Sequence, residues 1–217
     1  MRERLLSALF GGSCFVCRGA ARALLCAACD AELPRLVRPL CPRCALESPG
    51  GAVCGRCLRE PPAYDATFAA LAYEFPADVL VQALKFRGEL ALAPFLASLM
   101  AVEKRVDCVI PVPLSRDRLR QRGYNQAAEI ARGLRGVTID VFACERTRES
   151  PPQMDLPYDE RQKNVRGAFR CTRSLVGAHV AVVDDVMTTG ATLHELARTL
   201  KQAGALSVTN WVVARTL

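Results

Sequence analysis

Apolar and polar residues follow two different periods after position 63, which predicts a domain of mixed strands and helices. Tyr64–Tyr73 is apolar at every second position, as expected of a strand. Ala77–Phe86 is apolar at helical spacing and stops before Gly88, so it predicts a helix. A second helical stretch follows at Glu89–Val102, in which Pro94 permits a kink or a break.

The order of strand and then helix continues to the end of the chain. The pattern predicts strands at Val106–Val112, Val137–Phe142, His179–Asp184 and Leu206–Val213, and helices at Asn125–Leu134 and Thr192–Ala203. His179–Asp184 is almost continuously apolar, which suits a strand buried on both faces. Alternating strands and helices favour a parallel sheet covered on both sides, and such sheets bind ligands at the carboxyl ends of their strands.

The first 60 residues are dominated by cysteine. Four Cys-x-x-Cys pairs hold Cys14 and Cys17, Cys26 and Cys29, Cys41 and Cys44, and Cys54 and Cys57. A tight turn with such a pair presents both sulfurs to one metal, and two pairs complete the tetrahedral shell that Zn²⁺ prefers. Sequential pairing predicts two small zinc ribbons. An all-thiolate shell is closed to water, so the zinc would be structural.

A disulfide-rich module is the alternative for these cysteines. It would require an oxidising compartment, whereas the apolar run near the N-terminus is too short for a typical signal sequence. No stretch approaches the roughly 18 uncharged apolar residues of a membrane span. We therefore expect a cytoplasmic protein without membrane insertion. Pro61-Pro62 marks the predicted boundary between a zinc-ribbon module at 1–60 and an α/β domain at 61–217.

Composition changes this picture little. Hydrophobic residues make up 51% of the chain, which supports a packed core and argues against wholesale disorder. The net charge is +7, but thiolate-bound zinc would add negative charge to the N-terminal part, so basicity alone is weak evidence for nucleic acid. The arginines at 116, 118, 120 and 122 could meet an anionic substrate or a nucleic-acid strand. A solvated surface face is the alternative.

The segment Val180–Thr192 combines the requirements of a sugar-phosphate site. Its apolar strand delivers Asp184 and Asp185 to the sheet edge, where carboxylates can accept hydrogen bonds from a vicinal diol such as that of ribose. The next turn is rich in threonine and opens a helix, where free backbone N–H groups and hydroxyls favour a phosphate. Gly190 allows close approach of the backbone.

Three other interpretations of this segment are weaker. A Walker B strand would be accompanied by a P-loop, and the chain has no Gly-Lys pair. A dinucleotide site would require a Gly-x-Gly-x-x-Gly turn after an early strand, which is also missing. A purely structural turn would not need two adjacent carboxylates where desolvation is costly. The residues therefore favour a phosphoribosyl site.

Val180–Thr192 resembles the signature of type I phosphoribosyltransferases, and the whole chain resembles the ComF family of competence proteins. Further matching blocks are Leu84–Gly88, Ile110–Leu114, Arg122–Gln126, Arg146-Thr147 with Gln153, and Arg161–Phe169. The four cysteine pairs resemble the double zinc ribbon of that family. The resemblance implies a phosphoribosyltransferase-like parallel-sheet domain of the α/β class with a small N-terminal double zinc ribbon.

The resemblance also implies roles for particular residues. Asp184 and Asp185 would hold the ribose of phosphoribosyl pyrophosphate, which binds with Mg²⁺. The 5′-phosphate would lie against Thr188, Thr189, Gly190, Ala191 and Thr192, and the pyrophosphate loop would be Pro111, Val112, Pro113 and Leu114. Arg161, Lys163 and Asn164 would belong to a mobile cover loop that neutralises the departing pyrophosphate, with a solvated basic turn as the alternative. Lys85 and Arg87 could serve the site or only favour a helix C-terminus.

Two functions of different classes are compatible with these features. The first is an Mg²⁺-dependent phosphoribosyltransferase whose acceptor the sequence does not identify. The second is a non-catalytic competence factor that binds single-stranded DNA. A glutamine-dependent amidotransferase is disfavoured because the early cysteines belong to the zinc pairs. The ComF resemblance implies a part in DNA uptake during natural transformation, with proteins of the uptake machinery as partners.

Overall fold

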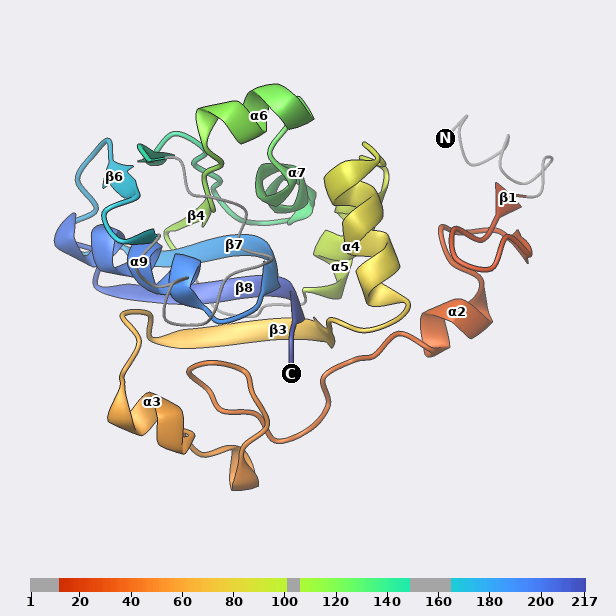
Figure 1. The fold of residues 1–217 in the computed structure, drawn as a ribbon, viewed down its shortest axis with the longest axis horizontal. Helices are drawn as coiled ribbons and strands as arrows, with labels where there is room; N and C mark the ends of the chain where they lie inside the picture. The colour runs from red at the N-terminus through yellow and green to blue at the C-terminus, as the bar shows by residue number, and fades with distance from the viewer. Residues whose placement is uncertain (1–11, 101–105, 149–164) are drawn as a thin grey trace.

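A four-stranded parallel sheet forms the centre of the computed structural model, which describes residues 12–100, 106–148 and 165–217 (Figure 1). The strand order is β3-β8-β7-β4. The bounds are Ala66–Ala72 for β3, Cys108–Pro111 for β4, His179–Met187 for β7 and Ser207–Arg215 for β8. The predicted parallel α/β sheet is therefore confirmed.

Helices cover both faces of the sheet. Alternate residues of β7 point to opposite sides, so this strand contributes to a separate core on each face. Val180 and Val182 belong to the core beneath α9 (Ala191–Gln202). Ala181 and Val183 belong to the core on the other face, which is packed beneath the helices α4 (Ala77–Phe86), α5 (Leu92–Leu99) and α7 (Gln126–Gly133). Both faces of β7 are thus dry, in agreement with its continuous apolar run.

The predicted helices occur with small shifts at their ends. Helix α4 has the predicted bounds, and Gly88, with φ of +73°, separates it from α5. Helix α5 is shorter than predicted within the described residues and begins at Leu92. Pro94 therefore lies in the first helical turn, where a missing N–H donor does no damage.

The predicted strand at Val137–Phe142 is wrong. Only an isolated parallel bridge, between Val109 and Ile139, joins this segment to β4. The carboxylate of Asp140 accepts a hydrogen bond from the N–H of Phe142 at 2.9 Å, which turns the chain away from the sheet. Phe142 is consequently exposed.

The sequence pattern also missed three short elements. Helix α6 (Arg116–Arg122) follows the loop after β4. The strands β5 (Cys144–Arg146) and β6 (Phe169–Cys171) form a separate antiparallel pair, in which Cys144 lies opposite Cys171.

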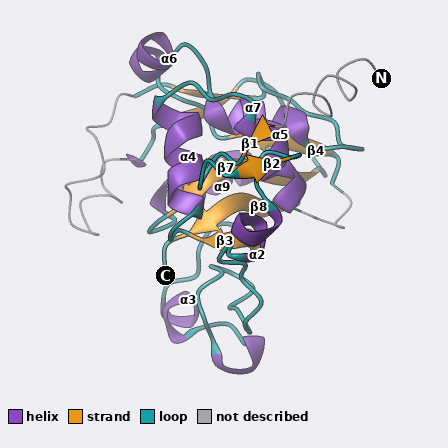
Figure 2. Ribbon diagram, turned by 90° about the vertical axis from the view of Figure 1, so that its right-hand side faces the viewer, coloured by secondary structure: helices purple, strands orange, loops and turns teal. Residues whose placement is uncertain are grey.

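The N-terminal residues form two small cysteine-rich units on different sides of the sheet (Figure 2). We call the unit with Cys14 to Cys29 the first ribbon and the unit with Cys41 to Cys57 the second ribbon. The first contains β1 (Gly12–Ser13), β2 (Ala20–Ala21) and α2 (Ala27–Ala31), and the second contains η1 (Pro49–Gly51) and α3 (Gly55–Arg59).

The segment between the two ribbons covers the outer edge of β3. Leu36 donates its N–H to Ala70, and Ala72 donates to Pro34. In the second ribbon, Pro42 accepts a hydrogen bond from the N–H of Thr67. The outer edge of β3 is therefore hydrogen-bonded to this segment and is not left open for pairing with another chain. Among the described residues, a helix with the length and hydropathy of a transmembrane span is not found.

Candidate functional site

Each ribbon gathers four cysteine sulfurs into one cluster, in the predicted sequential pairing. The four sulfurs of a cluster all lie within 4.8 Å of one another. Tetrahedral zinc with Zn–S bonds of about 2.3 Å requires sulfur separations of about 3.8 Å. The Cys17–Cys26 and Cys44–Cys54 sulfur pairs are 3.7 and 3.6 Å apart. Both clusters therefore fit structural zinc, and all eight cysteines are free of disulfides.

Backbone donors in the second ribbon favour the thiolate form that a metal needs. The N–H of Cys54 points at the sulfur of Cys41 at 3.3 Å. Desolvation opposes ionisation of Cys41, but the backbone hydrogen bonds outweigh it and lower its pKa to about 7.

The carboxyl ends of β4 and β7 meet at one edge of the sheet. Pro111 pairs with Val183, and the N–H of Val112 donates to the Val183 carbonyl at 2.9 Å. The predicted pyrophosphate loop, which continues through Pro113 and Leu114, therefore starts directly beside Asp184. Parallel pairing brings this loop beside a residue of β7 that is about 70 positions away in sequence.

The two adjacent acids differ in environment. Asp185 is 3% exposed, and its Oδ2 lies 3.1 Å from the Lys85 ammonium on α4. This oxygen has an opposite charge at ion-pair distance but no aligned hydrogen-bond donor among the described residues. Asp184 keeps part of its surface exposed. Desolvation, followed by the neighbouring charge of Asp185, raises the pKa of Asp184 to about 8.

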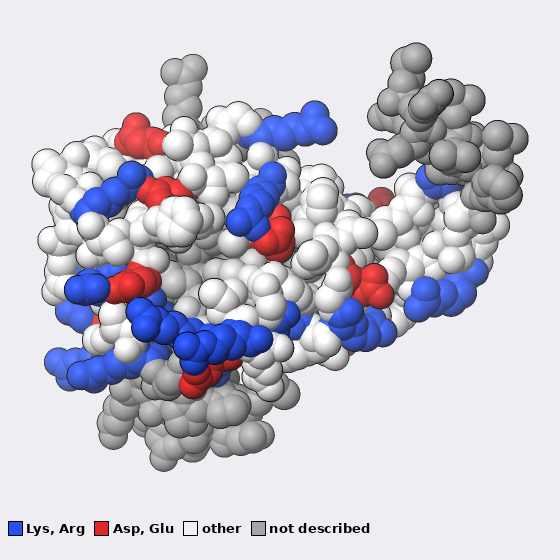
Figure 3. Space-filling model, turned by 90° about the horizontal axis from the view of Figure 1, so that it is seen from above, with Lys and Arg blue, Asp and Glu red and all other residues white. Residues whose placement is uncertain are grey.

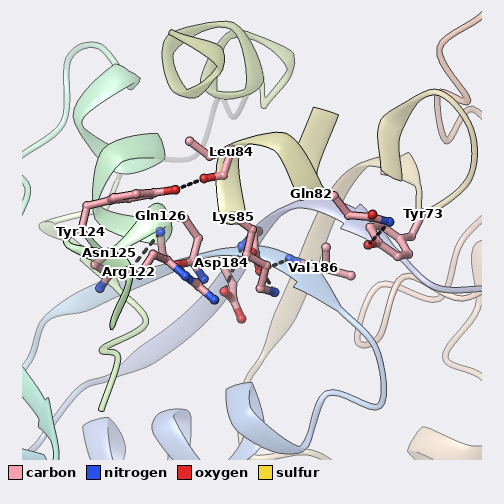
Figure 4. Close-up of polar contacts among 12 residues, drawn as sticks. Tyr73, Gln82, Leu84, Lys85, Arg122, Tyr124, Asn125, Gln126, Asp184 and Val186 are labelled. Carbon is pink, nitrogen blue, oxygen red and sulfur yellow. Dashed lines mark hydrogen bonds and ion pairs between the residues drawn. The ribbon is translucent and has the colours of Figure 1, made fainter. Parts of the chain in front are cut away.

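Lys85 is held in its charged form by this pair of acids. Burial would lower the pKa of Lys85, but the charges of Asp185 and Asp184 outweigh burial and raise it above its ordinary value. Lys85 therefore does more than favour a helix end. It lies beside the acids as a cation at the site (Figure 4).

The block 122–126 joins the loop after β4 to α4 and α7 (Figure 4). Asn125 donates from Nδ2 to the Val112 carbonyl at 3.0 Å, and its Oδ1 caps α7 by accepting from the Ala127 N–H at 3.0 Å. The Tyr124 hydroxyl donates to the carbonyl of Leu84, the neighbour of Lys85. These contacts hold the loop after β4, and helix α4 with its Lys85, at fixed positions beside the site.

The threonine-rich turn ends β7 and opens α9. Gly190 is the N-cap of α9 and has φ of +82°, a conformation that other residues adopt at a cost. A side chain there would also collide, because a Cβ atom would lie 2.7 Å from Met187 Cε and 3.0 Å from the Tyr64 hydroxyl. The Thr189 hydroxyl accepts from the N–H of Ala191 at 3.3 Å, and Thr188 is exposed. The turn has the open helix start that phosphate sites use.

A cavity of about 530 Å³ lies against this turn. Its wall includes Thr189, Gly190 and Ala191 from the turn, together with Arg56 of the second ribbon and Arg166. The turn therefore borders a cavity and is not sealed into the core. The phosphate interpretation requires such an open turn.

Three predicted site residues, Arg161, Lys163 and Asn164, lie outside the described residues.

Two arginines beside the turn were missed in the sequence analysis. Arg215 ends β8 and is 2% exposed, and Arg56 lies between two cysteines of the second ribbon. The sequence feature that could have identified Arg215 is a single cation directly after the apolar run 211–214.

Two family models match separate stretches of this chain. Residues 5–58 match the double zinc ribbon domain, and residues 119–216 match the phosphoribosyl transferase domain. The described structure thus defines a phosphoribosyltransferase-type α/β protein with a double zinc ribbon.

Relatives that share both parts identify the family. "DNA utilization protein YhgH" of Escherichia coli O157:H7 is 32% identical over 95% of this chain and 98% of its own length. "Competence protein F" of Haemophilus influenzae is 31% identical with the same coverage of both chains. The chain belongs to this ComF family.

A purine phosphoribosyltransferase from Pyrococcus horikoshii is a more distant structural neighbour. It is 22% identical, with a TM-score of 0.33 over 59% of this chain and 84% of its own.

Proposed function

We propose that this chain is a cytoplasmic, Mg²⁺-dependent phosphoribosyltransferase that binds phosphoribosyl pyrophosphate and takes part in the use of incoming DNA. One observation carries the proposal: the acids 184 and 185, the turn 188–192 and the loop 111–114 meet at a single edge of the sheet. The names of the relatives, which refer to competence and DNA utilization, support the role in DNA use.

Each part of this edge suits one part of the ligand. Asp184 would accept hydrogen bonds from the ribose hydroxyls, and the turn would donate its N–H groups to the 5′-phosphate. Lys85 and Arg122 would add positive charge near the acids, which a pyrophosphate group needs. When bound, Mg²⁺ with phosphoribosyl pyrophosphate supplies an activated ribose carbon and a leaving group. The chain would contribute position and charge.

Calorimetric titration with phosphoribosyl pyrophosphate and Mg²⁺ tests this proposal. Asp184→Asn tests the site more clearly than a substitution of Asp185 would. Asp185 is buried, and its replacement would leave Lys85 without its partner. Loss of one hydrogen-bond acceptor for the ribose hydroxyls predicts an affinity lower by about 10- to 100-fold.

Asp30→Asn is the matched control, because Asp30 forms an exposed ion pair with Arg35 in the N-terminal part of the chain. This variant should bind as the wild type does. Absence of binding by the wild type, or equal affinity of Asp184→Asn, would refute the site.

A second candidate function is single-stranded DNA binding without catalysis. Helix α6 carries four arginines, of which Arg122 lies near the acids, and a second cavity of about 340 Å³ lies beside the start of the helix. That cavity is lined by Arg116, Glu145, Arg146, Thr147, Arg148 and Arg170. Figure 3 views the molecule from the α6 side and shows basic side chains spread over this face with acidic ones between them. Such a surface favours contacts with phosphates over base recognition.

A further inference from the structure

Arg215 joins the second ribbon to the turn that follows β7. Its Nε donates to the carbonyl of Cys44 at 2.9 Å, and its Nη1 donates to the carbonyl of Met187 at 2.9 Å and also to that of Thr188. Cys44 is one of the four cysteines of the second cluster. A single buried side chain thus contacts both a zinc-ligand residue and the proposed phosphate turn.

Zinc would fix one end of this connection. It holds the four sulfurs of the cluster together, so it also fixes the position of the Cys44 carbonyl that Arg215 binds.

Arg56 makes a second connection between the same two parts. It lies in α3 between Cys54 and Cys57, and its Nη2 donates to the carbonyl of Thr189 at 2.8 Å. The carbonyls of residues 187, 188 and 189 are thus all bound by arginines.

Fixed carbonyls determine where the N–H groups of the turn point. A trans peptide is planar, so the C=O of one residue and the N–H of the next point in opposite directions. Binding the carbonyls of residues 187 to 189 therefore orients the N–H groups of Thr188, Thr189 and Gly190 away from the arginines. These N–H groups belong to the turn that we propose as the phosphate site.

The first ribbon offers an internal comparison. It belongs to the core on the α4 side of the sheet, whereas the second ribbon belongs to the α9 side. Its Phe15 ring lies 5.8 Å from the Arg87 guanidinium, just beyond the end of α4. Zinc in this ribbon should be independent of the turn.

We infer that Arg215 is a positioning residue that couples zinc in the second ribbon to phosphate binding at residues 188–192. The inference rests on the proposed function, because it assumes that the turn binds the 5′-phosphate of phosphoribosyl pyrophosphate. Coupling is reciprocal, so the bound ligand must also stabilise zinc in the second ribbon.

The test measures zinc release from the full-length protein containing zinc in both ribbons. A chromogenic zinc chelator would follow release with and without phosphoribosyl pyrophosphate and Mg²⁺. Alkylation of newly freed thiols, mapped by mass spectrometry, would assign each release to a ribbon. At equilibrium with the chelator, we expect the ligand to raise the apparent zinc affinity of the second ribbon by about fivefold or more, as is typical of coupled sites, and to leave that of the first ribbon unchanged.

Two variants at position 215 and one control sharpen the result. Arg215→Met should bind the ligand more weakly and show no protection of zinc. Arg215→Lys keeps the charge, but one ammonium cannot contact Cys44 and Thr188 as the guanidinium does, so the fold should persist while the coupling is lost. Arg35→Met removes an exposed arginine paired with Asp30 and should retain full protection.

The outcomes separate this inference from the proposed function. A wild type that binds the ligand without protecting zinc, or an Arg215→Lys variant that protects it fully, would overturn the coupling alone. A wild type that does not bind phosphoribosyl pyrophosphate would overturn the proposed function and the coupling together.

Discussion

At the scale of single residues, Asn125 shows how one side chain can serve both structure and site. Its amide nitrogen holds the Val112 carbonyl in the loop after β4, while its oxygen caps α7. The two roles use different atoms of the amide, so substitutions can separate them.

Asn125→Ala removes both hydrogen bonds and should lower the free energy of unfolding by about 1–2 kcal/mol, measured by urea denaturation. Asn125→Asp keeps the capping oxygen, so it should be more stable than the alanine variant. It loses the donor to Val112 and adds negative charge beside the proposed pyrophosphate loop, so ligand binding should weaken. Equal stability of the two variants would show that the cap contributes nothing.

Asp184 should make stability depend on pH. Its pKa is about 8 in the folded protein, against about 4 in an unfolded chain. Between these values the folded state holds a proton that the unfolded state has lost, so stability is highest at the acid end and falls as pH rises towards 8. Among the described residues, Asp185, Lys85 and Arg122 are charged groups that face this site.

Urea denaturation across this pH window, with wild type and Asp184→Asn in parallel, measures the effect. The wild type should lose stability relative to the variant as pH rises, because asparagine does not titrate. A constant difference between the two curves would mean that Asp184 is already ionised throughout.

At the scale of elements, turns and caps decide where the site lies. Helix α6 was missed because its sequence has one apolar residue among seven, so no amphipathic period exists. Its ends do carry signals, since the Ser115 hydroxyl accepts from the Arg118 N–H and Gly123 adopts φ of +82°. Cap residues would have identified this helix where periodicity could not.

Two glycines with positive φ offer a matched test of the turn before α9. Gly136→Ala meets no atom of the described residues within 4 Å, so it should cost only the backbone penalty of about 1–2 kcal/mol. Gly190→Ala adds collisions with Met187 and Tyr64 and should cost about 1 kcal/mol or more beyond that. Thermal unfolding measures both. Only Gly190→Ala should also weaken binding of phosphoribosyl pyrophosphate, and equal binding by both variants would argue against the turn as the phosphate site.

At the scale of the whole molecule, charge distribution matters more than net charge. The two cysteine clusters pack with different hydrophobic cores, and each bound zinc would bring a negative centre into the N-terminal part. Helix α6, which carries four arginines, lies apart from both ribbons (Figure 1). If the chain binds single-stranded DNA, these arginines are the candidates for binding its phosphates.

Binding of single-stranded DNA at several salt concentrations tests that surface. Replacing Arg116 and Arg120 by alanine should reduce the slope of log affinity against log salt by about 0.7 for each phosphate that the protein no longer neutralises. Replacing Arg35 and Arg38, which form exposed ion pairs in the N-terminal part, removes the same charge and should leave the slope close to that of the wild type. Equal slopes for the two double variants would exclude α6 as the DNA-binding surface.

Local patterns in the sequence were sufficient for the elements whose period or spacing is strong. The cysteine pairs predicted both clusters because a Cys-x-x-Cys turn brings its two sulfurs together without help from the rest of the chain. The apolar run before Asp184 predicted a strand because a short, continuous apolar run suits a strand buried on both faces. The strand predicted at Val137–Phe142 failed because a side-chain hydrogen bond to Asp140 redirects the backbone.

Only the tertiary structure decided how distant residues combine. Parallel pairing of β4 with β7 brings the loop after Pro111 beside Asp184, and helix packing brings Lys85 to Asp185. The hydrogen bond from Arg215 to Cys44 joins residues 171 positions apart. No local period encodes such contacts, since they depend on the strand order and on which face each ribbon covers.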